Sequence, residues 1–304
     1  MTEMTTRVHP PVADCTVIIA TMAKESRRDS LLRAIDSVRD GNASTIEVLI
    51  VVNGDRYSPS LVELLGRRVD LSLIRLPSAS LPSARYAGRK AVRSQFFAFL
   101  DDDDEYLPGA IDKRIAILSS DPKAGLVASN GFRFSGGKET LALNALIDVE
   151  SDPLAAVLRE NWLASCGGLY RTERIPAVFF EDMPQYLEWT WLAFRIASIG
   201  EVVRILPEPT FRINDTPKSE SKSEAYMLSH VEVIDRMMRT TRRADILAML
   251  GRMQSTALNC ASNHYRKNGL LREAWRAHLR SLRQPGGLRY ITYTRHLIFG
   301  NRQD

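Results

Sequence analysis

The sequence predicts an α/β fold with a mainly parallel sheet, followed by a C-terminal helical region. Three observations predict it. Short runs rich in Val and Ile alternate with amphipathic segments through the first hundred residues, as in parallel β–α–β units. Some runs, such as "IEVLIVVN" at 46–53, are apolar almost without a break, which is typical of strands covered on both faces. From about residue 224 onward the pattern is helical.

Periodicity places the elements in order along the chain. Residues 26–38, for example, carry Leu31, Leu32, Ile35 and Val38 on one helical stripe. Strands are predicted at 16–21, 46–53, 70–77, 96–100, 125–130, 164–172 and 201–209. Helices are predicted at 26–38, 83–92, 108–120 and 188–198.

Composition shifts suggest three regions. Residues 1–13, rich in Thr and Pro, are expected to be a disordered extension, 14–222 a single α/β domain, and 223–304 a basic helical region. Breaks in the last region are expected at Gly251, Gly269 and 284–287. No stretch approaches the roughly 20 apolar residues of a membrane span, and the N-terminus has no apolar signal segment, so a cytoplasmic location is expected.

The composition is that of an ordinary globular protein, but its charge is uneven. The chain has 304 residues and a formal net charge of +5, whereas residues 231–304 alone carry 14 Lys and Arg against 5 Asp and Glu. Such a basic region suggests an anionic surface as partner, with a solvated helical face as the alternative. Three widely spaced cysteines without metal-type spacing suggest reduced packing residues.

Polar side chains stand where three predicted strands end. Thr21 ends the first strand, Asn53 the second, and the run Asp101 to Asp104 follows the strand at 96–100. In an open α/β sheet the carboxyl ends of parallel strands share one crevice, which binds ligands. Carboxylates one residue apart can share Mg²⁺ or Mn²⁺, which neutralises a diphosphate. The alternative is an acidic N-terminus of the following helix.

Several segments together resemble a known family. The order of "TVIIATMAKESRRDSLLRAIDSV", "VLIVVNGD", "SLPSARYAGRKAVRSQFFAFLDDDDEYLPGAI", "GGLYR" and "YLEWTWLAFRIASIGEVVRILPEP" resembles the family 2 glycosyltransferases of GT-A fold, over roughly residues 14–215. The resemblance implies a Rossmann-like nucleotide-binding domain. It also implies inverting transfer of a sugar from a UDP- or dTDP-sugar, usually with Mn²⁺ or Mg²⁺.

The resemblance also implies roles for the acidic run. Asp101 and Asp103 match the family's Asp-x-Asp motif, with Asp101 near the donor ribose and Asp103 as the metal ligand, which Asp101 assists. Asp102 and Asp104 are alternatives, because a run of four does not fix the register. Asp102 is counted with Asp101 among the donor-binding residues.

Three further positions match the donor pocket. Thr21 and Asn53 match positions that line the nucleobase, and Arg85 matches an arginine near the donor. The side-chain oxygen of Asn53 can accept the N3–H of a uracil. The alternatives are a turn residue for Asn53, since Asn-Gly favours turns, and a solvated helix residue for Arg85.

The acceptor side is expected around residue 188. Displacement at an anomeric carbon needs a base opposite the departing diphosphate, and the family provides an acid at the start of a helix. Glu188 matches that place, with Trp189 where a second acid often stands; Asp182 is the reserve base. Trp189 and Trp191 are expected to offer an apolar wall to the acceptor sugar, one of them being in the core.

Two basic segments complete the expectations. In "FRINDTPKSESKS", Asn214, Lys218, Ser219 and Ser221 suggest a loop that wraps the diphosphate, or else a flexible surface loop. The C-terminal segment mixes Arg with Trp, Tyr, Leu and Ile, which suits an anionic membrane and a lipid-linked acceptor. Its alternative is a helical cap on the catalytic domain or a homodimer contact.

Together these observations predict a metal-dependent inverting glycosyltransferase that acts in cell-surface polysaccharide biosynthesis, peripheral to the cytoplasmic face of the membrane. Its partners would be a nucleotide-sugar donor and a glycan or lipid-linked acceptor, and no nucleic acid is expected. One alternative is a catalytically inactive nucleotide-sugar-binding scaffold, which Trp189 keeps open. A sugar nucleotidyltransferase is less favoured, because "TMAKESRR" has no Gly-rich loop after the first strand.

Overall fold

The computed structural model describes residues 13–299 except 145, 147 and 216–222. The chain folds into two compact units. The first comprises the described residues up to 150 together with 162–182 and 201–214, and the second comprises 151–161, 183–200 and the described residues from 215 onward. The boundary expected at 222/223 stays a prediction.

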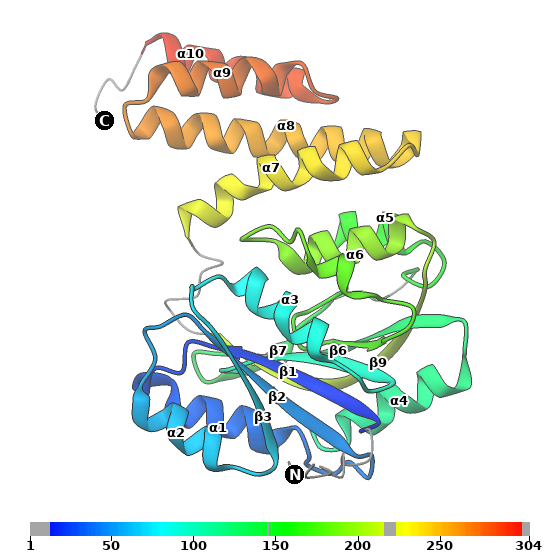
Figure 1. The fold of residues 1–304 in the computed structure, drawn as a ribbon. Coiled ribbons are helices and arrows are strands. Elements are labelled where there is room, and N and C mark those ends of the chain that lie inside the picture. Colours follow the sequence, from blue (N-terminus) through cyan, green and yellow to red (C-terminus); the bar gives the residue numbers. More distant parts are fainter. Residues whose placement is uncertain (1–12, 145, 147, 216–222, 300–304) are drawn as a thin grey trace, which may run out of the picture. The chain divides into compact units, whose positions relative to one another are not determined.

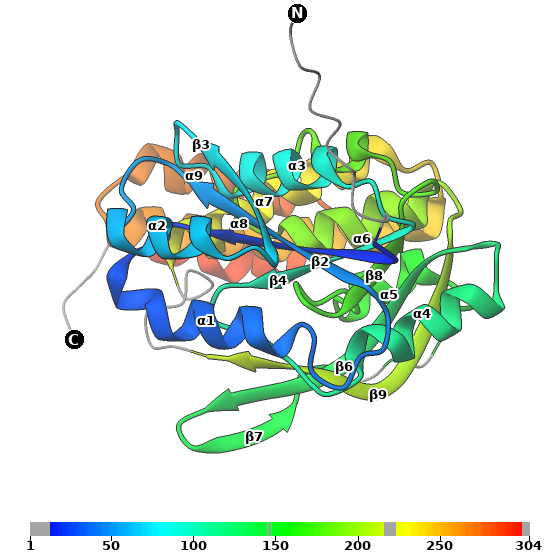
Figure 2. The same cartoon turned by 60° about the horizontal axis from the view of Figure 1, so that its bottom comes forward.

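A nine-stranded sheet forms the centre of the first unit, among the residues described. Its order is β3-β2-β1-β4-β8-β6-β9-β5, with β7 paired to β6. Figure 2 shows β7 beside the end of β6. The strands are β1 Cys15–Thr21, β2 Ile46–Asn53, β3 Leu71–Leu76, β4 Phe96–Asp101, β5 Glu105–Tyr106, β6 Ala124–Ser135, β7 Lys138–Leu141, β8 Gly168–Arg171 and β9 Val202–Asn214.

Most strands of this sheet point the same way. β3, β2, β1 and β4 are mutually parallel, and β8 is antiparallel to both β4 and β6. β6 therefore runs in the direction of β4, and β9 is parallel to β6. The predicted mainly parallel α/β fold is confirmed.

Helices cover both faces of the parallel strands. They are α1 Arg28–Ser37, after the short 3₁₀ turn η1 Glu25–Arg27, α2 Pro59–Arg67, α3 Leu81–Ala91 and α4 Ala110–Ser120; the 3₁₀ turn η2 Ala177–Phe180 also belongs here. α1, α2 and α4 pack on the face that carries Val17 and Ile19. α3 packs on the other face, where a Cβ on Gly88 would lie 2.5 Å from Ile18 Cγ2. Gly88 thus lets helix and sheet approach closely.

The second unit is helical. Its helices are α5 Pro153–Arg159, α6 Glu188–Ser198, α7 Glu224–Thr240, α8 Ala244–Lys267, α9 Leu271–Leu282, the 3₁₀ segment η4 Gly287–Tyr293 and α10 Thr294–Ile298. α8 packs against α7 and against α9, which lie on opposite sides of it (Figure 1). None of the helices described is both long and apolar enough to cross a membrane.

One predicted break is wrong. α8 continues through Gly251, whereas Gly269 does end it, with a positive φ of 74°. Gly251 is buried, and a Cβ there would lie 2.7 Å from Pro285 Cδ. Tertiary packing thus explains this glycine, because it makes room for the loop after α9. The sequence pattern also left α2, α5 and β7 unassigned and stopped β9 five residues short of Asn214.

Candidate active site

Four strand ends meet at the carboxyl edge of the sheet. β1 ends at Thr21, β2 at Asn53, β4 at Asp101 and β9 at Asn214. These strands point the same way, so their last residues and the turn after β4 lie at one edge. Asp102 to Asp104 occupy that turn, directly before β5. The acidic run therefore stands among polar groups from distant parts of the chain.

Asp102 points toward the end of β1. Its Oδ2 accepts a hydrogen bond from Thr21 Oγ1 at 2.6 Å, and its Oδ1 accepts one from Arg27 Nη1 at 2.6 Å. Thr21 Oγ1 in turn accepts the backbone N–H of Ala23. Burial raises the pKa of Asp102 above its usual range, although the charge of Arg27 opposes this shift. Both oxygens of Asp102 are thus engaged within the fold.

Asp101 and Asp103 each keep one oxygen without a partner among the described residues. Arg85 Nη2 donates to Asp101 Oδ1 at 3.1 Å, and Arg27 Nη1 lies 2.9 Å from Asp103 Oδ2. Their side chains are 33% and 27% exposed, more than those of the neighbouring acids. Burial raises the pKa of Asp103. The charge of Arg27 opposes this shift, whereas the charges of Asp101 and Asp102 increase it. These two acids are the accessible members of the run.

Asp104 is buried and bonded within the fold. It is 4% exposed; its Oδ1 accepts the backbone N–H of Asn214 at 3.0 Å, and Cys166 Sγ lies 3.8 Å from its Oδ2. Burial, with the charge of Asp101, raises the pKa of Asp104 to about 8. Asn214 Nδ2 also donates to the carbonyl of Asp103 and to Glu105. These bonds attach the acidic turn to the end of β9.

The donor set at this edge fits a hard divalent cation bound jointly with phosphate. No group of three or more His, Cys, Asp and Glu side chains among the described residues is arranged to hold a metal by itself. Mg²⁺, however, is usually held by one or two carboxylates, with substrate phosphates and water as the other ligands. The partly exposed carboxylates of Asp101 and Asp103 supply that number.

Asn53 and Arg85 are both buried at this edge. Asn53 Oδ1 accepts the backbone N–H of Ser80 at 2.7 Å, and Ser80 caps the N-terminus of α3. Arg85, on the first turns of α3, is 3% exposed and so is not a solvated helix residue. Through Asn53 the end of β2 thus holds the helix that carries Arg85 to Asp101.

The expected acceptor residues fall in both units. Asp182 is exposed in the first unit, whereas Glu188 opens α6 in the second, after Leu187 with a positive φ of 58°. Trp189 is half-buried, and Trp191 is 7% exposed with its Nε1 buried and unbonded. The expectation that one tryptophan belongs to the core thus falls on Trp191.

Tyr226 of α7 stands near Glu188 in the second unit. Burial raises the pKa of Tyr226, and the charge of Glu188 raises it further. The ring of Tyr226 makes edge contacts with Tyr186 and His230. The ring of Tyr226 therefore lies against Tyr186, two residues before α6 begins. Lys218, Ser219 and Ser221 of the expected diphosphate loop lie outside the described residues.

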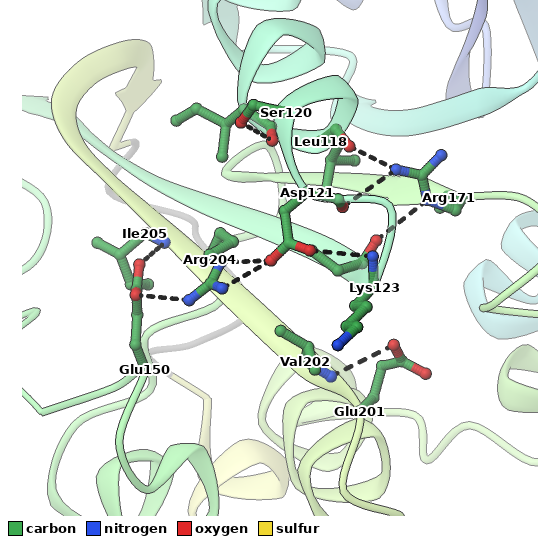
Figure 3. Close-up of polar contacts among 12 residues, drawn as sticks. Leu118, Ser120, Asp121, Lys123, Glu150, Arg171, Glu201, Val202, Arg204 and Ile205 are labelled. Carbon is green, nitrogen blue, oxygen red and sulfur yellow. Dashed lines mark hydrogen bonds and ion pairs between the residues drawn. The ribbon is translucent and has the colours of Figure 1, made fainter.

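A further polar network of the first unit lies away from the acidic run. Arg204 pairs with Asp121 and Glu150, and Arg171 donates to the carbonyls of Leu118 and Ala124 (Figure 3). These residues stand near the beginnings of β6 and β9, at the edge opposite the acidic run. Arg204 is paired with carboxylates and Arg171 is bonded to backbone carbonyls, so this network joins α4 to the sheet.

Residues 16–155 match the model of glycosyl transferase family 2. This part of the chain is a family 2 glycosyltransferase domain. The matched residues include β1 to β4 and the acidic run, so the predicted family and enzyme class are confirmed. No curated protein matches the chain.

Solved structures with the same fold include those of S. aureus TarS. The structure of TarS 1-349 with UDP-GlcNAc has a TM-score of 0.59 at 15% identity, covering 87% of this chain and 79% of that one. TarS 1-349 with UDP has a TM-score of 0.55 at 13% identity, covering 85% and 74%. At this identity the likeness to TarS is one of fold.

Sequence reasoning missed Arg27 and Cys166 at the transferase domain's acidic turn, and it named Asn214 only as a residue of a loop that wraps the diphosphate. Arg27 bridges Asp102 and Asp103, Cys166 contacts Asp104, and the backbone of Asn214 holds the same side chain. Arg27 lies six residues after the end of β1, in the basic segment "SRR". This position was the one sequence feature that could have pointed to its role. Cys166 had none, because its role depends on a contact across 62 residues.

Proposed function

We propose that the protein transfers a sugar from a nucleoside-diphosphate sugar of UDP or dTDP type to a hydroxyl of a glycan or glycolipid acceptor, with inversion. The observation that carries the proposal is the pair Asp101 and Asp103 at the carboxyl edge of a family 2 domain, with Arg27 and Arg85 beside them. That TarS 1-349 was solved with UDP-GlcNAc and with UDP supports this donor class.

The donor diphosphate is proposed to bind at the acidic edge. Asp101 and Asp103 would hold Mn²⁺ or Mg²⁺, which supplies positive charge to the departing diphosphate. Arg85, buried against Asp101, is held by the fold and can add a second positive charge at the same edge. Thr21 and Asn53 are proposed to line the nucleobase pocket. Because both side-chain oxygens already accept a backbone N–H, they also fix the shape of that pocket.

The acceptor hydroxyl is proposed to attack the anomeric carbon from the side opposite the diphosphate. As the new C–O bond forms, the bond from that carbon to the diphosphate oxygen breaks, and the hydroxyl proton passes to a carboxylate. Glu188 is proposed as this base, with Asp182 in reserve, and Trp189 as an apolar wall for the acceptor. We further propose Lys218 and Ser219 as diphosphate-loop residues, and a cytoplasmic location at the membrane periphery, where a lipid-linked acceptor is reached.

The test is the thermal midpoint of the purified full chain with UDP, dTDP, GDP, CDP and ADP, each with Mn²⁺, Mg²⁺ or EDTA. A ligand that binds only the folded state raises the midpoint. We expect a metal-dependent rise with UDP or dTDP and none with EDTA. A protein shown to be folded that responds to no nucleotide contradicts the proposal.

A second candidate function is an inactive nucleotide-sugar-binding scaffold. It is favoured by Trp189, which follows Glu188 where the family often has another acid. A scaffold would bind the donor but release no nucleotide diphosphate from it in the presence of acceptor extracts, and Glu188→Gln would change nothing.

A further inference from the structure

Exposed apolar side chains gather on the last helices of the second unit. Of the twelve large hydrophobic side chains found exposed in the described part of the chain, seven lie within residues 270–299. Leu288 is 71% exposed and Phe299 is 74% exposed. Single exposed apolar side chains scattered over a surface are usual in monomeric proteins. A concentration of them in thirty residues instead indicates an interaction surface.

On α9 these side chains share one stripe with arginines. Arg272, Arg276, Leu279 and Arg283 are exposed and follow one another at intervals of four, three and four residues, which places them on one helix face. The opposite stripe is buried against α8 and consists of Ala274, Ala277, His278 and Ser281. Ser281 and Ser255 of α8 hydrogen bond to each other across this contact. The arginine stripe therefore faces away from α8.

The segment after α9 repeats the pattern. Leu288, Ile291, Arg295 and Ile298 are exposed at intervals of three, four and three residues along η4 and α10, while Leu297 is buried. η4 and α10 both contact α9, and Figure 1 shows α9 and α10 together on the side of α8 away from α7. We call the following exposed side chains the outer face: Arg272, Arg276, Leu279, Arg283, Leu288, Ile291, Arg295, Ile298 and Phe299.

The arginines of the outer face have no acidic partners within the described chain. Arg272, Arg276, Arg283 and Arg295 form no ion pair there, whereas Arg280, just off the stripe, pairs with Asp235. Glu273 is the only acidic residue between 271 and 299. The outer face is thus strongly positive as well as apolar, and its positive charge is available to a partner.

We propose that the outer face binds the surface of an anionic lipid bilayer. Arginines meet the headgroups while Leu279, Leu288, Ile291, Ile298 and Phe299 enter the boundary of the acyl region. A second copy of this chain fits less well, because a symmetric contact would set arginines against arginines. A nucleic acid would pair with the arginines but leave the exposed aliphatic side chains without a role.

This inference names the partner of the C-terminal helices and rests on the proposed function only for the lipid-linked acceptor. It is tested apart from the reaction. Vesicle binding is measured without nucleotide, and nucleotide binding is measured without vesicles, so either can fail while the other stands.

The experiment is flotation of the full chain with phosphatidylcholine vesicles, with and without phosphatidylglycerol. We expect binding only to the anionic vesicles, weakening as salt rises. Arg272→Gln with Arg276→Gln should lower the partition coefficient about thirtyfold, at the strength expected for two arginines near an anionic surface. Leu279→Ser with Ile298→Ser should lower it as well, since apolar insertion is lost.

Matched variants separate this face from general charge and apolarity. Arg67→Gln with Arg93→Gln removes two exposed arginines of the first unit, and Val69→Ser with Leu141→Ser removes two of its exposed apolar side chains. Both pairs should float like the unaltered chain, and circular dichroism should show all variants folded. The proposal is overturned if the chain does not float with anionic vesicles, or if the control pairs lose as much binding as the outer-face variants. It is also overturned if the chain does not bind vesicles and the outer-face variants instead abolish self-association or RNA retention.

Discussion

Residue scale: Arg27 is the cation that holds the acidic turn in this structure. One guanidinium nitrogen lies 2.6 Å from Asp102 and 2.9 Å from Asp103, although the side chain is 44% exposed. Two carboxylates on consecutive residues repel each other, and a shared cation lowers that cost. A divalent metal at Asp103 would therefore meet the positive charge of Arg27 at the same carboxylate.

We expect Arg27→Gln to tighten Mn²⁺ binding several-fold in the absence of nucleotide, because the competing guanidinium is gone. Mn²⁺ titration followed by electron paramagnetic resonance measures this directly. Arg28→Gln is the matched control, since the neighbouring Arg28 pairs only with the exposed Glu25 among the residues described. Equal Mn²⁺ affinities in the two variants would show that Arg27 does not compete at the metal site.

Glu188 can be tested with the donor that the thermal-shift panel selects. Glu188→Gln should leave the donor Kd unchanged and reduce transfer by about 10²-fold or more, the usual contribution of a general base. The readout is acceptor-dependent release of the nucleotide diphosphate. Asp182→Asn should keep most activity; the reverse outcome, with Glu188→Gln active and Asp182→Asn inactive, would move the base to Asp182.

Element scale: α8 is a long helix that tolerates a glycine for packing reasons. A glycine inside a helix costs about 1 kcal/mol relative to alanine, so its presence needs a compensating contact. Here that contact is Pro285, whose rigid ring occupies the space of the missing Cβ. The loop between α9 and η4 thus rests on α8 at Gly251.

Gly251→Ala should therefore destabilise the helical unit, because over-packing typically costs about 1–3 kcal/mol and exceeds the helix-propensity gain. Gly66→Ala in α2 should instead be neutral or stabilising, because nothing lies within 4 Å of the position that its Cβ would take. Thermal denaturation followed by circular dichroism gives both signs. A gain in midpoint for Gly251→Ala would mean that Pro285 moves aside at no cost.

Whole-molecule scale: the acidic turn makes stability depend on pH in an unusual direction. The pKa of Asp104 is raised to about 8 in the fold, from an ordinary value near 4. Between these values the folded chain holds a proton that the unfolded chain has released, so unfolding becomes easier as pH rises. Below about pH 4 both states are protonated and this contribution is constant.

We predict that the thermal midpoint of the chain falls as pH rises from about 4 toward 8, and that Asp104→Asn reduces this slope. Asparagine keeps an oxygen for the N–H of Asn214 and cannot ionise. Thermal scans across that range test it. Glu181→Gln, at an exposed acid of the same unit, serves as control; identical slopes for the two variants would exclude Asp104 as the source.

The sequence by itself determined the alternation of strands and helices, a mainly parallel sheet, and the gathering of Thr21, Asn53 and the acidic run at one edge. These features follow from local periodicity and from the rule that parallel strands end together. The continuity of α8 could not be read in this way, because Gly251 is explained by a residue 34 positions away.

Only the tertiary structure decided which of the four aspartates are bonded within the fold and which stay accessible. The run leaves β4 after Asp101, so strand alternation no longer fixes where each side chain points. Arg27 lies 75 residues before Asp102 and bonds to it, and Asn214 lies 110 residues after Asp104 and bonds to it. Asp101 and Asp103 are left as the accessible acids of the run. Adjacent identical residues carry the same local signal, and contacts between distant segments are what distinguish them.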